Sequence, residues 1–273
     1  MKAAPFDYAR PMSLDAALPL LTESTKPMAG GQSLGPMLNL RLARPARVID
    51  VGALTALRGV RVTPAGIEIG AGVTHAEIED GVHAPLRGHP VQAVAAQIAY
   101  RAVRNRGTVG GSLAHADPAA DWVVVMTALG ATLAMASVHG PRTLPMAEFM
   151  LGAYTTALRD GELLTAVTVP SLGADTRWGY DKFCRKPGEF AEASAAVLFA
   201  PASRTARIVL GALDGAPLEL AALAAAIAHE GHIAASRERI VAAVREALPQ
   251  RDAIDCGLHA VCVARALARA GVA

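Results

Sequence analysis

Two short segments with paired glycines constrain this sequence more than any other feature. The first is Ala29-Gly30-Gly31-Gln32-Ser33-Leu34, and the second is Gly107-Thr108-Val109-Gly110-Gly111-Ser112. Glycine pairs let the backbone take positive φ and turn successive N–H groups to one side, which makes a concavity suited to anions, above all phosphates. Each segment is also typical of a plain tight turn. Lying about eighty residues apart, the two predict either both walls of one dinucleotide cleft or two unrelated turns.

The composition narrows the class of protein. Of the 273 residues, 52% are apolar and 18% are charged, a balance opposite to that of a disordered chain. The net charge of +2 and the aromatic content of 4% argue against a nucleic-acid partner, which needs a basic surface and stacking side chains. The length favours about two domains.

The cysteines and the apolar runs indicate whether the chain can hold an iron–sulfur cluster, which compartment suits it and whether it spans a membrane. Cys184, Cys256 and Cys262 are too few for a [2Fe–2S] cluster held by cysteine alone, which needs four thiolates. They form no close pair, so we expect a reduced, cytoplasmic compartment. The segment Met1–Arg10 does not resemble a signal peptide. The longest uncharged run, Trp122–Val138, is too short and too polar for a membrane helix, so we expect no membrane span.

The remaining pattern alternates short helices and strands. Ser13 is a suitable N-cap for a first helix. The apolar spacing predicts one long helix over Val91–Arg106, then a loop over Gly107–Asp117 and a helix over Pro118–Leu129. The polar stretch Ser171–Arg177 marks a domain boundary. Strands are predicted at 47–51, 59–63, 66–70, 131–137, 161–170, 193–200 and 206–213, and further helices at 74–80, 218–228, 237–247 and 259–270.

Three motifs imitate functional sites. Gly70-Ala71-Gly72-Val73-Thr74-His75 follows a strand and opens a helix, but His75 stands where a Rossmann site needs its third glycine. His115-Ala116-Asp117 lacks a second pair of metal ligands at a readable spacing. His229-Glu230-Gly231-His232 has its histidines three residues apart rather than the four of a zinc-protease motif. We expect no metal site from these residues.

The two glycine segments, read with the residues around them, resemble a known family. Ala29–Leu34 together with Arg104–Asp121 is similar to the FAD-binding medium subunit of the xanthine oxidase family of molybdenum hydroxylases. Phe6-Asp7-Tyr8-x-Arg10-Pro11, Gly161-Glu162-Leu163-Leu164 and Tyr180-x-Lys182-Phe183 also look like that family. The resemblance runs to about residue 215.

The resemblance implies an α+β fold in two parts. Residues 1–172 would be an FAD-binding domain of the vanillyl-alcohol-oxidase (PCMH) type, built from two α/β subdomains at about 1–57 and 58–172. Residues 173–273 would be a CO-dehydrogenase-flavoprotein-like domain, a small antiparallel sheet with helices. It also implies two partners, a large molybdenum-cofactor subunit and a small subunit with two [2Fe–2S] clusters, as a dimer of heterotrimers.

The resemblance further assigns residues to FAD and none to catalysis or to a metal. Backbone groups of both glycine segments would bind the pyrophosphate and ribityl region, and Asp121 would hydrogen-bond a hydroxyl on the flavin side. Leu164 would touch the cofactor through its backbone, and Lys182 would lie at the carbonyl edge of the isoalloxazine ring. The residues so assigned are Ala29, Gly30, Gly31, Gln32, Ser33, Leu34, Thr108, Val109, Gly110, Gly111, Ser112, Asp121, Leu164 and Lys182.

At two places the sequence departs from the family pattern. Many relatives have Asn where this chain has Ser112, and Asp255–His259 does not match the usual Tyr-Arg-containing segment. The leading hypothesis is an FAD-bearing electron-transfer subunit of a molybdenum hydroxylase. The alternatives are a self-sufficient single-chain FAD-dependent oxidase, for which we find no substrate base, and a scaffold that retains the fold without the flavin.

Overall fold

The computed structural model describes residues 2–272, and the fold class is α+β. The chain separates into two compact units. The first unit comprises the chain up to His115 together with Thr132–Phe149 and Thr155–Val169. The second unit comprises Ala116–Ala131, Met150–Tyr154 and the chain from Pro170 onward.

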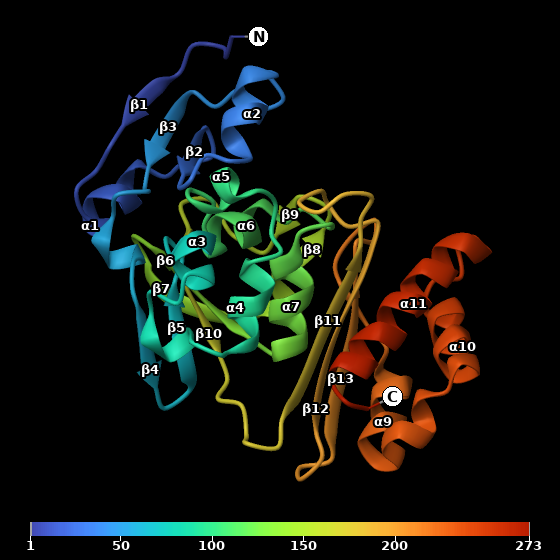
Figure 1. Cartoon of the computed structure of the whole chain (residues 1–273). Helices are drawn as coiled ribbons and strands as arrows, with labels where there is room; N and C mark the ends of the chain where they lie inside the picture. The colour runs from blue at the N-terminus through green and yellow to red at the C-terminus, as the bar shows by residue number, and fades with distance from the viewer. Residues whose placement is uncertain (1, 273) are drawn as a thin grey trace. The chain divides into compact units, whose positions relative to one another are not determined.

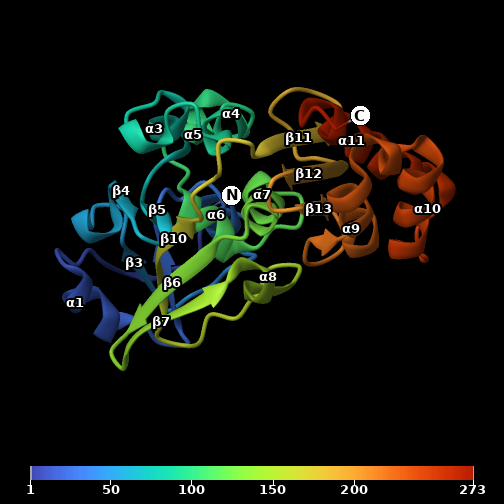
Figure 2. The same cartoon turned by 90° about the horizontal axis from the view of Figure 1, so that it is seen from below.

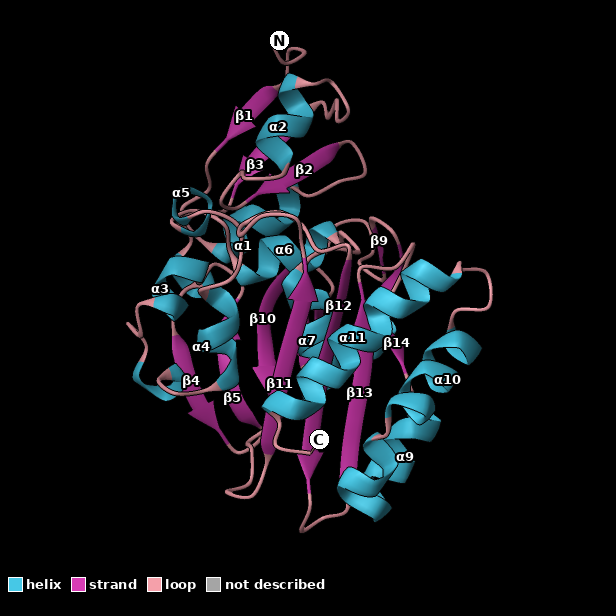
Figure 3. Cartoon of the chain, turned by 45° about the vertical axis from the view of Figure 1, so that its right-hand side comes forward, coloured by secondary structure: helices cyan, strands magenta, loops and turns pink. Residues whose placement is uncertain are grey.

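A small parallel sheet begins the first unit. Its strand order is β1-β3-β2, and both neighbours of β3 run parallel to it. Figure 3 shows helix α2 beside these three strands. The first helix begins after Ser13, whose hydroxyl accepts a hydrogen bond from the amide of Ala16 as predicted. The elements are β1 (Asp7–Ala9), α1 (Leu14–Ala17), η1 (Leu18–Leu20), β2 (Thr25–Met28), α2 (Leu34–Asn39), β3 (Arg47–Asp50) and η2 (Thr55–Leu57).

A five-stranded antiparallel sheet forms the rest of the first unit, in the order β4-β5-β10-β6-β7. Strand β10 lies at its centre and pairs with β5 on one side and β6 on the other (Figure 1). The elements are β4 (Val60–Thr63), β5 (Gly66–Gly70), α3 (His75–Glu79), η3 (Ala84–Leu86), α4 (Pro90–Ala95), α5 (Arg101–Arg104), α6 (Val109–His115), β6 (Thr132–Ser137), β7 (Gly140–Pro145), α8 (Met146–Phe149), β9 (Thr155–Thr156) and β10 (Leu163–Val169).

The second unit is an antiparallel sheet, β11-β12-β13-β14, with helices on both faces. Helices α9 and α11 pack on one face, with α10 against these two helices, and α7 packs on the other face, as Figure 2 shows. A Cβ placed on Gly179 of β11 would come within 1.8 Å of the carbonyl oxygen of Ala266 in α11, so glycine permits this close packing. The elements are α7 (Asp121–Leu129), β8 (Met150–Gly152), β11 (Arg177–Phe183), β12 (Ala193–Ala200), β13 (Thr205–Gly211), β14 (Leu218–Glu219), α9 (Ala221–Glu230), η4 (Gly231–Ala235), α10 (Arg237–Ala247) and α11 (Ala253–Arg269).

Several predicted elements are wrong in their bounds, and the helix predicted over 259–270, for example, begins at Ala253. The single helix over Val91–Arg106 is two helices, α4 and α5, because the backbone between them turns at Ala99, which has φ of 42°. The stretch Gly107–Asp117 is not all loop, because helix α6 occupies Val109–His115. Helix α7 begins at Asp121 rather than Pro118, which lies in the preceding turn.

The compact units do not follow the predicted domain boundary at residue 172. Helix α7 interrupts the first unit in sequence but packs against β12 and β13 of the second, because its apolar side chains are covered by that sheet. The division into domains 1–172 and 173–273 stays a prediction. Within residues 2–272, no helix combines the length and the apolar character needed to cross a bilayer.

Candidate functional site

The two glycine segments lie against each other in the first unit. A Cβ placed on Gly30 would come within 1.8 Å of the carbonyl oxygen of Arg106. The Arg106 side chain also contacts Gly30, because its Nε donates to the Gly30 carbonyl oxygen at 3.2 Å. A Cβ on Gly111 would come within 3.8 Å of the Ala29 Cβ. Segments separated by about eighty residues in the sequence thus form one continuous surface.

The first segment joins strand β2 to helix α2. Gly31 has φ of +72°, a left-handed conformation that side chains disfavour. Over residues 2–272, the amides of Gly31, Gln32 and Ser33 have no hydrogen-bond acceptor. Ser33 is exposed and its two neighbours are half-buried. Three successive donors on a partly open turn, followed by the start of a helix, form an arrangement that binds anions.

The second segment leads into helix α6, which begins at Val109, and most of its amides have acceptors inside the protein. Val109 donates to the carbonyl oxygen of Val73 at 3.0 Å, and Gly110 donates to that of Ala71 at 2.9 Å. Gly111 donates to Thr108 Oγ1 at 3.0 Å. These three amides are therefore already paired, and the assignment of backbone groups of this segment to a ligand stays a prediction. This segment offers a ligand the exposed backbone of Gly111 and the half-buried side chain of Ser112.

Close packing, not positive φ, explains the glycines at two positions. Of Gly30, Gly31, Gly110 and Gly111, only Gly31 has positive φ. A Cβ on Gly110 would come within 2.4 Å of the Ala71 Cβ, just as one on Gly30 would meet Arg106. These glycines allow two backbones to approach, whereas the sequence interpretation gave all of them a turn-forming role.

Asp121, Tyr180 and Lys182 form a buried polar cluster in the second unit. Tyr180 donates from its hydroxyl to Asp121 Oδ1 at 2.7 Å, and Lys182 Nζ donates to the same oxygen at 2.7 Å. The side chains of Lys182 and Asp121 are only 8% and 9% exposed. Burial, with the Asp121 carboxylate nearby, raises the pKa of Tyr180 well above its usual value, so the phenol stays protonated.

This cluster corrects one sequence interpretation, that of Lys182, and adds one residue, Tyr180. Without the family resemblance, Lys182 reads as a solvated surface residue, and the structure buries it in an ion pair. Tyr180 had no predicted role, although it shares the Asp121 oxygen with Lys182. Alternation along a strand places residues 180 and 182 on the same face, which is the signal that points to them jointly.

Leu164 lies on the central strand β10 and is 4% exposed. The register against β6 is interrupted between Leu164 and Ala166, so the strand bulges at Thr165. The Thr165 carbonyl oxygen accepts from the amide of Ala71 at 2.9 Å. Since Ala71 in turn holds Gly110, the bulge beside Leu164 is linked to the second glycine segment by two hydrogen bonds.

The two metal-like motifs, His115–Asp117 and His229–His232, are not part of a metal-binding cluster in the described chain. Over residues 2–272, no group of three His, Cys, Asp or Glu side chains is placed to hold a metal ion. Cys184, Cys256 and Cys262 are free thiols. Burial, with the Asp181 carboxylate as the next cause, raises the pKa of Cys262 to about 12, so this thiol is inert at neutral pH.

Comparison with known proteins places the chain in a family. Residues 4–172 match the model described as the FAD binding domain in molybdopterin dehydrogenase. The nicotine 6-hydroxylase medium subunit of Paenarthrobacter nicotinovorans is 38% identical over 219 residues, which cover 79% of this chain and 76% of that protein. The carbon monoxide dehydrogenase medium chain of Hydrogenophaga pseudoflava is 35% identical over 203 residues, covering 73% and 71%.

Solved structures agree with the sequence relatives. Reconstituted CO dehydrogenase from Oligotropha carboxidovorans superimposes with a TM-score of 0.89 at 30% identity, over 100% of both chains. Quinoline 2-oxidoreductase from Pseudomonas putida 86 gives a TM-score of 0.87 at 31% identity, over 99% of this chain and 98% of that one. The chain belongs to the FAD-binding medium subunits of the molybdenum hydroxylase family and is an oxidoreductase subunit whose cofactor is FAD.

Proposed function

We propose that this chain holds FAD on its two glycine segments and is the electron-exit subunit of a molybdenum hydroxylase. In this role, electrons come from the [2Fe–2S] clusters of a small partner subunit and leave to an external acceptor. The observation that supports the proposal best is the contact between Gly30 and Arg106, which joins the two segments into one surface.

The residues present fit a diphosphate of this kind. The acceptor-free amides of Gly31, Gln32 and Ser33 supply neutral donors, and the first turn of α2 follows them directly. Gly111 lies beside Ala29 with an exposed backbone, so a ligand can approach this surface closely. We assign the pyrophosphate to Ala29–Leu34 and a supporting contact to Thr108–Ser112, in which the Ser112 hydroxyl takes part because the amides of residues 109–112 already have acceptors.

Three further residues are proposed as FAD contacts on the family resemblance. Leu164 would contact the cofactor through its backbone, and Asp121 and Lys182 would contact the flavin side. Because the Lys182 ammonium is paired with the Asp121 carboxylate, the two act as a dipole rather than as a lone cation. Tyr180 holds the shared Asp121 oxygen in place from the other side. FAD, when bound, supplies the one- and two-electron redox chemistry.

The proposed partners follow from the same role. A large molybdenum-cofactor subunit would oxidise the substrate, and a small subunit would carry two [2Fe–2S] clusters, since the three cysteines of this chain are fewer than a cluster needs. We propose a dimer of such heterotrimers in the cytoplasm. The domain division at residue 172 is proposed with it, the first part holding FAD.

The test is to purify the full chain and record its visible spectrum before and after adding FAD, then identify the chains and metals that copurify with it. We expect a flavin spectrum with 1:1 FAD, and molybdenum and iron in the copurifying chains. A folded protein that cannot be reconstituted with FAD would reject the cofactor site. Turnover of an alcohol or amine by the isolated chain would favour a single-chain oxidase.

A further inference from the structure

The segment Ala71–His75, which only imitates a dinucleotide-binding motif, has another place in the fold. Its backbone pairs with the second glycine segment. The amide of His75 donates to the Gly107 carbonyl oxygen at 3.0 Å, and Thr74 and Thr108 form a β-bridge. The bonds from Val109 and Gly110 to Val73 and Ala71 continue the pairing. Backbone pairing with residues 71–75 therefore holds residues 107–110 in place.

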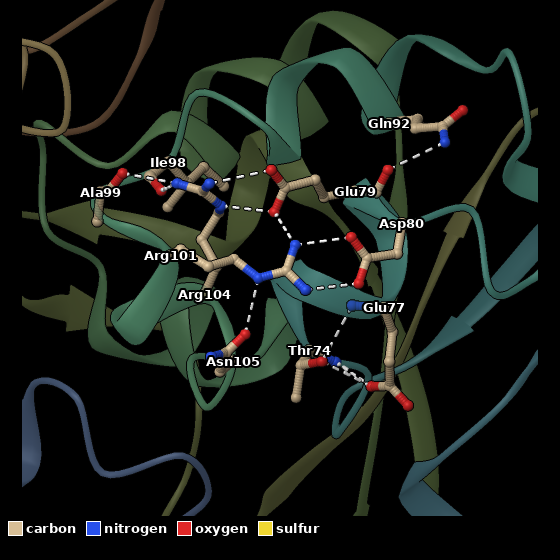
Figure 4. Close-up of polar contacts among 10 residues, drawn as sticks. All are labelled: Thr74, Glu77, Glu79, Asp80, Gln92, Ile98, Ala99, Arg101, Arg104 and Asn105. Carbon is tan, nitrogen blue, oxygen red and sulfur yellow. Dashed lines mark hydrogen bonds and ion pairs between the residues drawn. The ribbon is translucent and has the colours of Figure 1, made fainter.

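Each of the two paired segments is connected to a helix. Residues 71–75 lead directly into α3, and α5 leads through Asn105 and Arg106 into the second glycine segment. Thr74 caps α3 in a capping box with Glu77, each side chain bonding the other residue's backbone (Figure 4). A shift of α5 against α3 would thus be transmitted to Gly107 within a few residues.

Two arginines of α5 bond to the end of α3, and Arg104 is the more buried of the two. Arg104 donates from Nε and Nη2 to the two carboxylate oxygens of Glu79 at 2.7 and 2.9 Å. Its Nη1 donates to the carbonyl oxygens of Ile98 and Ala99 at 2.9 and 2.8 Å (Figure 4). The Arg104 side chain is 12% exposed. Its hydrogen bonds hold the pKa of Glu79 below the usual value, so the carboxylate is charged at neutral pH.

The same contacts stabilise the break between α4 and α5. Ala99 has φ of 42°, a conformation that costs a non-glycine residue about 1 kcal/mol or more. The break frees the Ile98 and Ala99 carbonyl oxygens from helical bonding, and Arg104 satisfies both. Arg104 therefore connects the kink, α3 and the entry to the second glycine segment.

We propose that Arg104, paired with Glu79, is a positioning residue that sets the second glycine segment in register with the first and thereby sets the affinity for FAD. The proposal rests on the function proposed above, in that Thr108–Ser112 is assigned to the cofactor. Arg104 acts through Gly107 and its neighbours and needs no contact with FAD.

Arg101 provides a matched control on the same helix. It pairs with Asp80 and Glu79 at 2.6 and 2.8 Å, but its side chain is 47% exposed and it bonds no carbonyl oxygen of the kink. Exposed ion pairs contribute little to stability. Replacing Arg101 removes the same charge from α5 and leaves the Arg104 contacts in place.

The experiment compares Arg104→Met, Glu79→Gln and Arg101→Met in the full chain. Hydrogen–deuterium exchange without FAD measures the protection of amides 107–111, and flavin fluorescence quenching measures the Kd for FAD. For Arg104→Met we expect exchange at 107–111 to rise and the Kd to increase about tenfold. Glu79→Gln should raise the exchange at 107–111 and the Kd for FAD as well, but by smaller amounts. Arg101→Met should change the Kd less than about twofold.

The outcomes separate this inference from the proposed function. A lower Tm for Arg104→Met and Glu79→Gln with unchanged exchange at 107–111 and unchanged Kd means a merely structural ion pair and overturns the inference. A wild-type chain that is folded but does not bind FAD rejects the proposed function, while exchange at 107–111 still decides whether Arg104 orders that segment. If Arg104→Met does not fold, Glu79→Gln decides alone.

Discussion

Gly30 lies so close to Arg106 that a Cβ on Gly30 would come within 1.8 Å of the Arg106 carbonyl oxygen. The neighbour is backbone, so it cannot rotate away as a side chain would. The contact joins the segment that follows β2 to the one that precedes α6, and the proposed FAD surface depends on it. Any side chain at position 30 must push these two segments apart.

We therefore expect Gly30→Ala to weaken FAD binding by at least about tenfold and to lower the free energy of unfolding by about 1–3 kcal/mol, as overpacking does. Fluorescence titration with FAD and denaturant unfolding of the apoprotein measure the two effects. Gly35 is the matched control in the same region, since a Cβ there meets nothing within 4 Å. Gly35→Ala should stabilise helix α2 by up to about 1 kcal/mol and leave FAD binding unchanged. Equal Kd values for the two variants would contradict the proposed surface.

Adjacent glycines in the second segment should separate folding from binding. Gly110 is buried, and a Cβ there would come within 2.4 Å of the Ala71 Cβ, so Gly110→Ala should lower the free energy of unfolding by about 1–3 kcal/mol. Gly111 is exposed, and a Cβ there would press mainly on Thr108 Oγ1 at 2.9 Å. Gly111→Ala should retain most of the stability and lose affinity for FAD. Thermal unfolding with and without FAD checks both, and a stable Gly110→Ala variant would count against the packing argument.

The sequence predicted the local elements better than the contacts between them. Ser13 marked the first helix, and the segments 193–200 and 206–213 were predicted as strands of the second unit, because these signals lie within a few neighbouring residues. The kink at Ala99 carried no such signal. The kink is stabilised by Arg104, whose side chain donates hydrogen bonds to two carbonyl oxygens there, a contact that forms only in the folded chain.

The residues of the candidate site stay a prediction, and the sequence did not predict how the two glycine segments contact each other. Spacing alone left two glycine segments that could belong together or not, and the family resemblance decided in favour of one site. The helical form of the second segment was missed because its amide acceptors, Val73 and Ala71, come from a distant strand end. The Glu79–Arg104 pair, separated by 25 residues in sequence, likewise has no local signature.

The cluster around Asp121 should be sensitive to loss of its cation. Lys182→Met leaves the buried Asp121 carboxylate with the Tyr180 hydroxyl as its remaining side-chain donor among the bonds described above. Removing one partner of a buried pair costs about 3–5 kcal/mol, and we expect a loss of this size in denaturant unfolding. Arg185 pairs with Glu192 at 2.7 Å on the surface, with side chains 79% and 40% exposed. Arg185→Met should cost less than about 1 kcal/mol. Similar losses for both variants would show that burial does not govern the Asp121 cluster.

His75 should make stability depend on pH below neutrality. Burial, with the Arg104 charge as a second cause, lowers the pKa of His75 to about 4, against about 6.5 in the unfolded chain. Between these values the unfolded chain binds the proton and the folded chain does not, so stability rises with pH across this window. As the pH falls from about 6.5 to 4, the wild type should lose up to about 3 kcal/mol from this residue, and below the folded pKa the loss should level off.

His75→Gln should flatten that part of the profile, whereas replacing the exposed His229 of α9 by Gln should leave it unchanged. Denaturant unfolding at half-unit steps of pH measures the slopes, and parallel profiles for wild type and His75→Gln would show that another group titrates in this range.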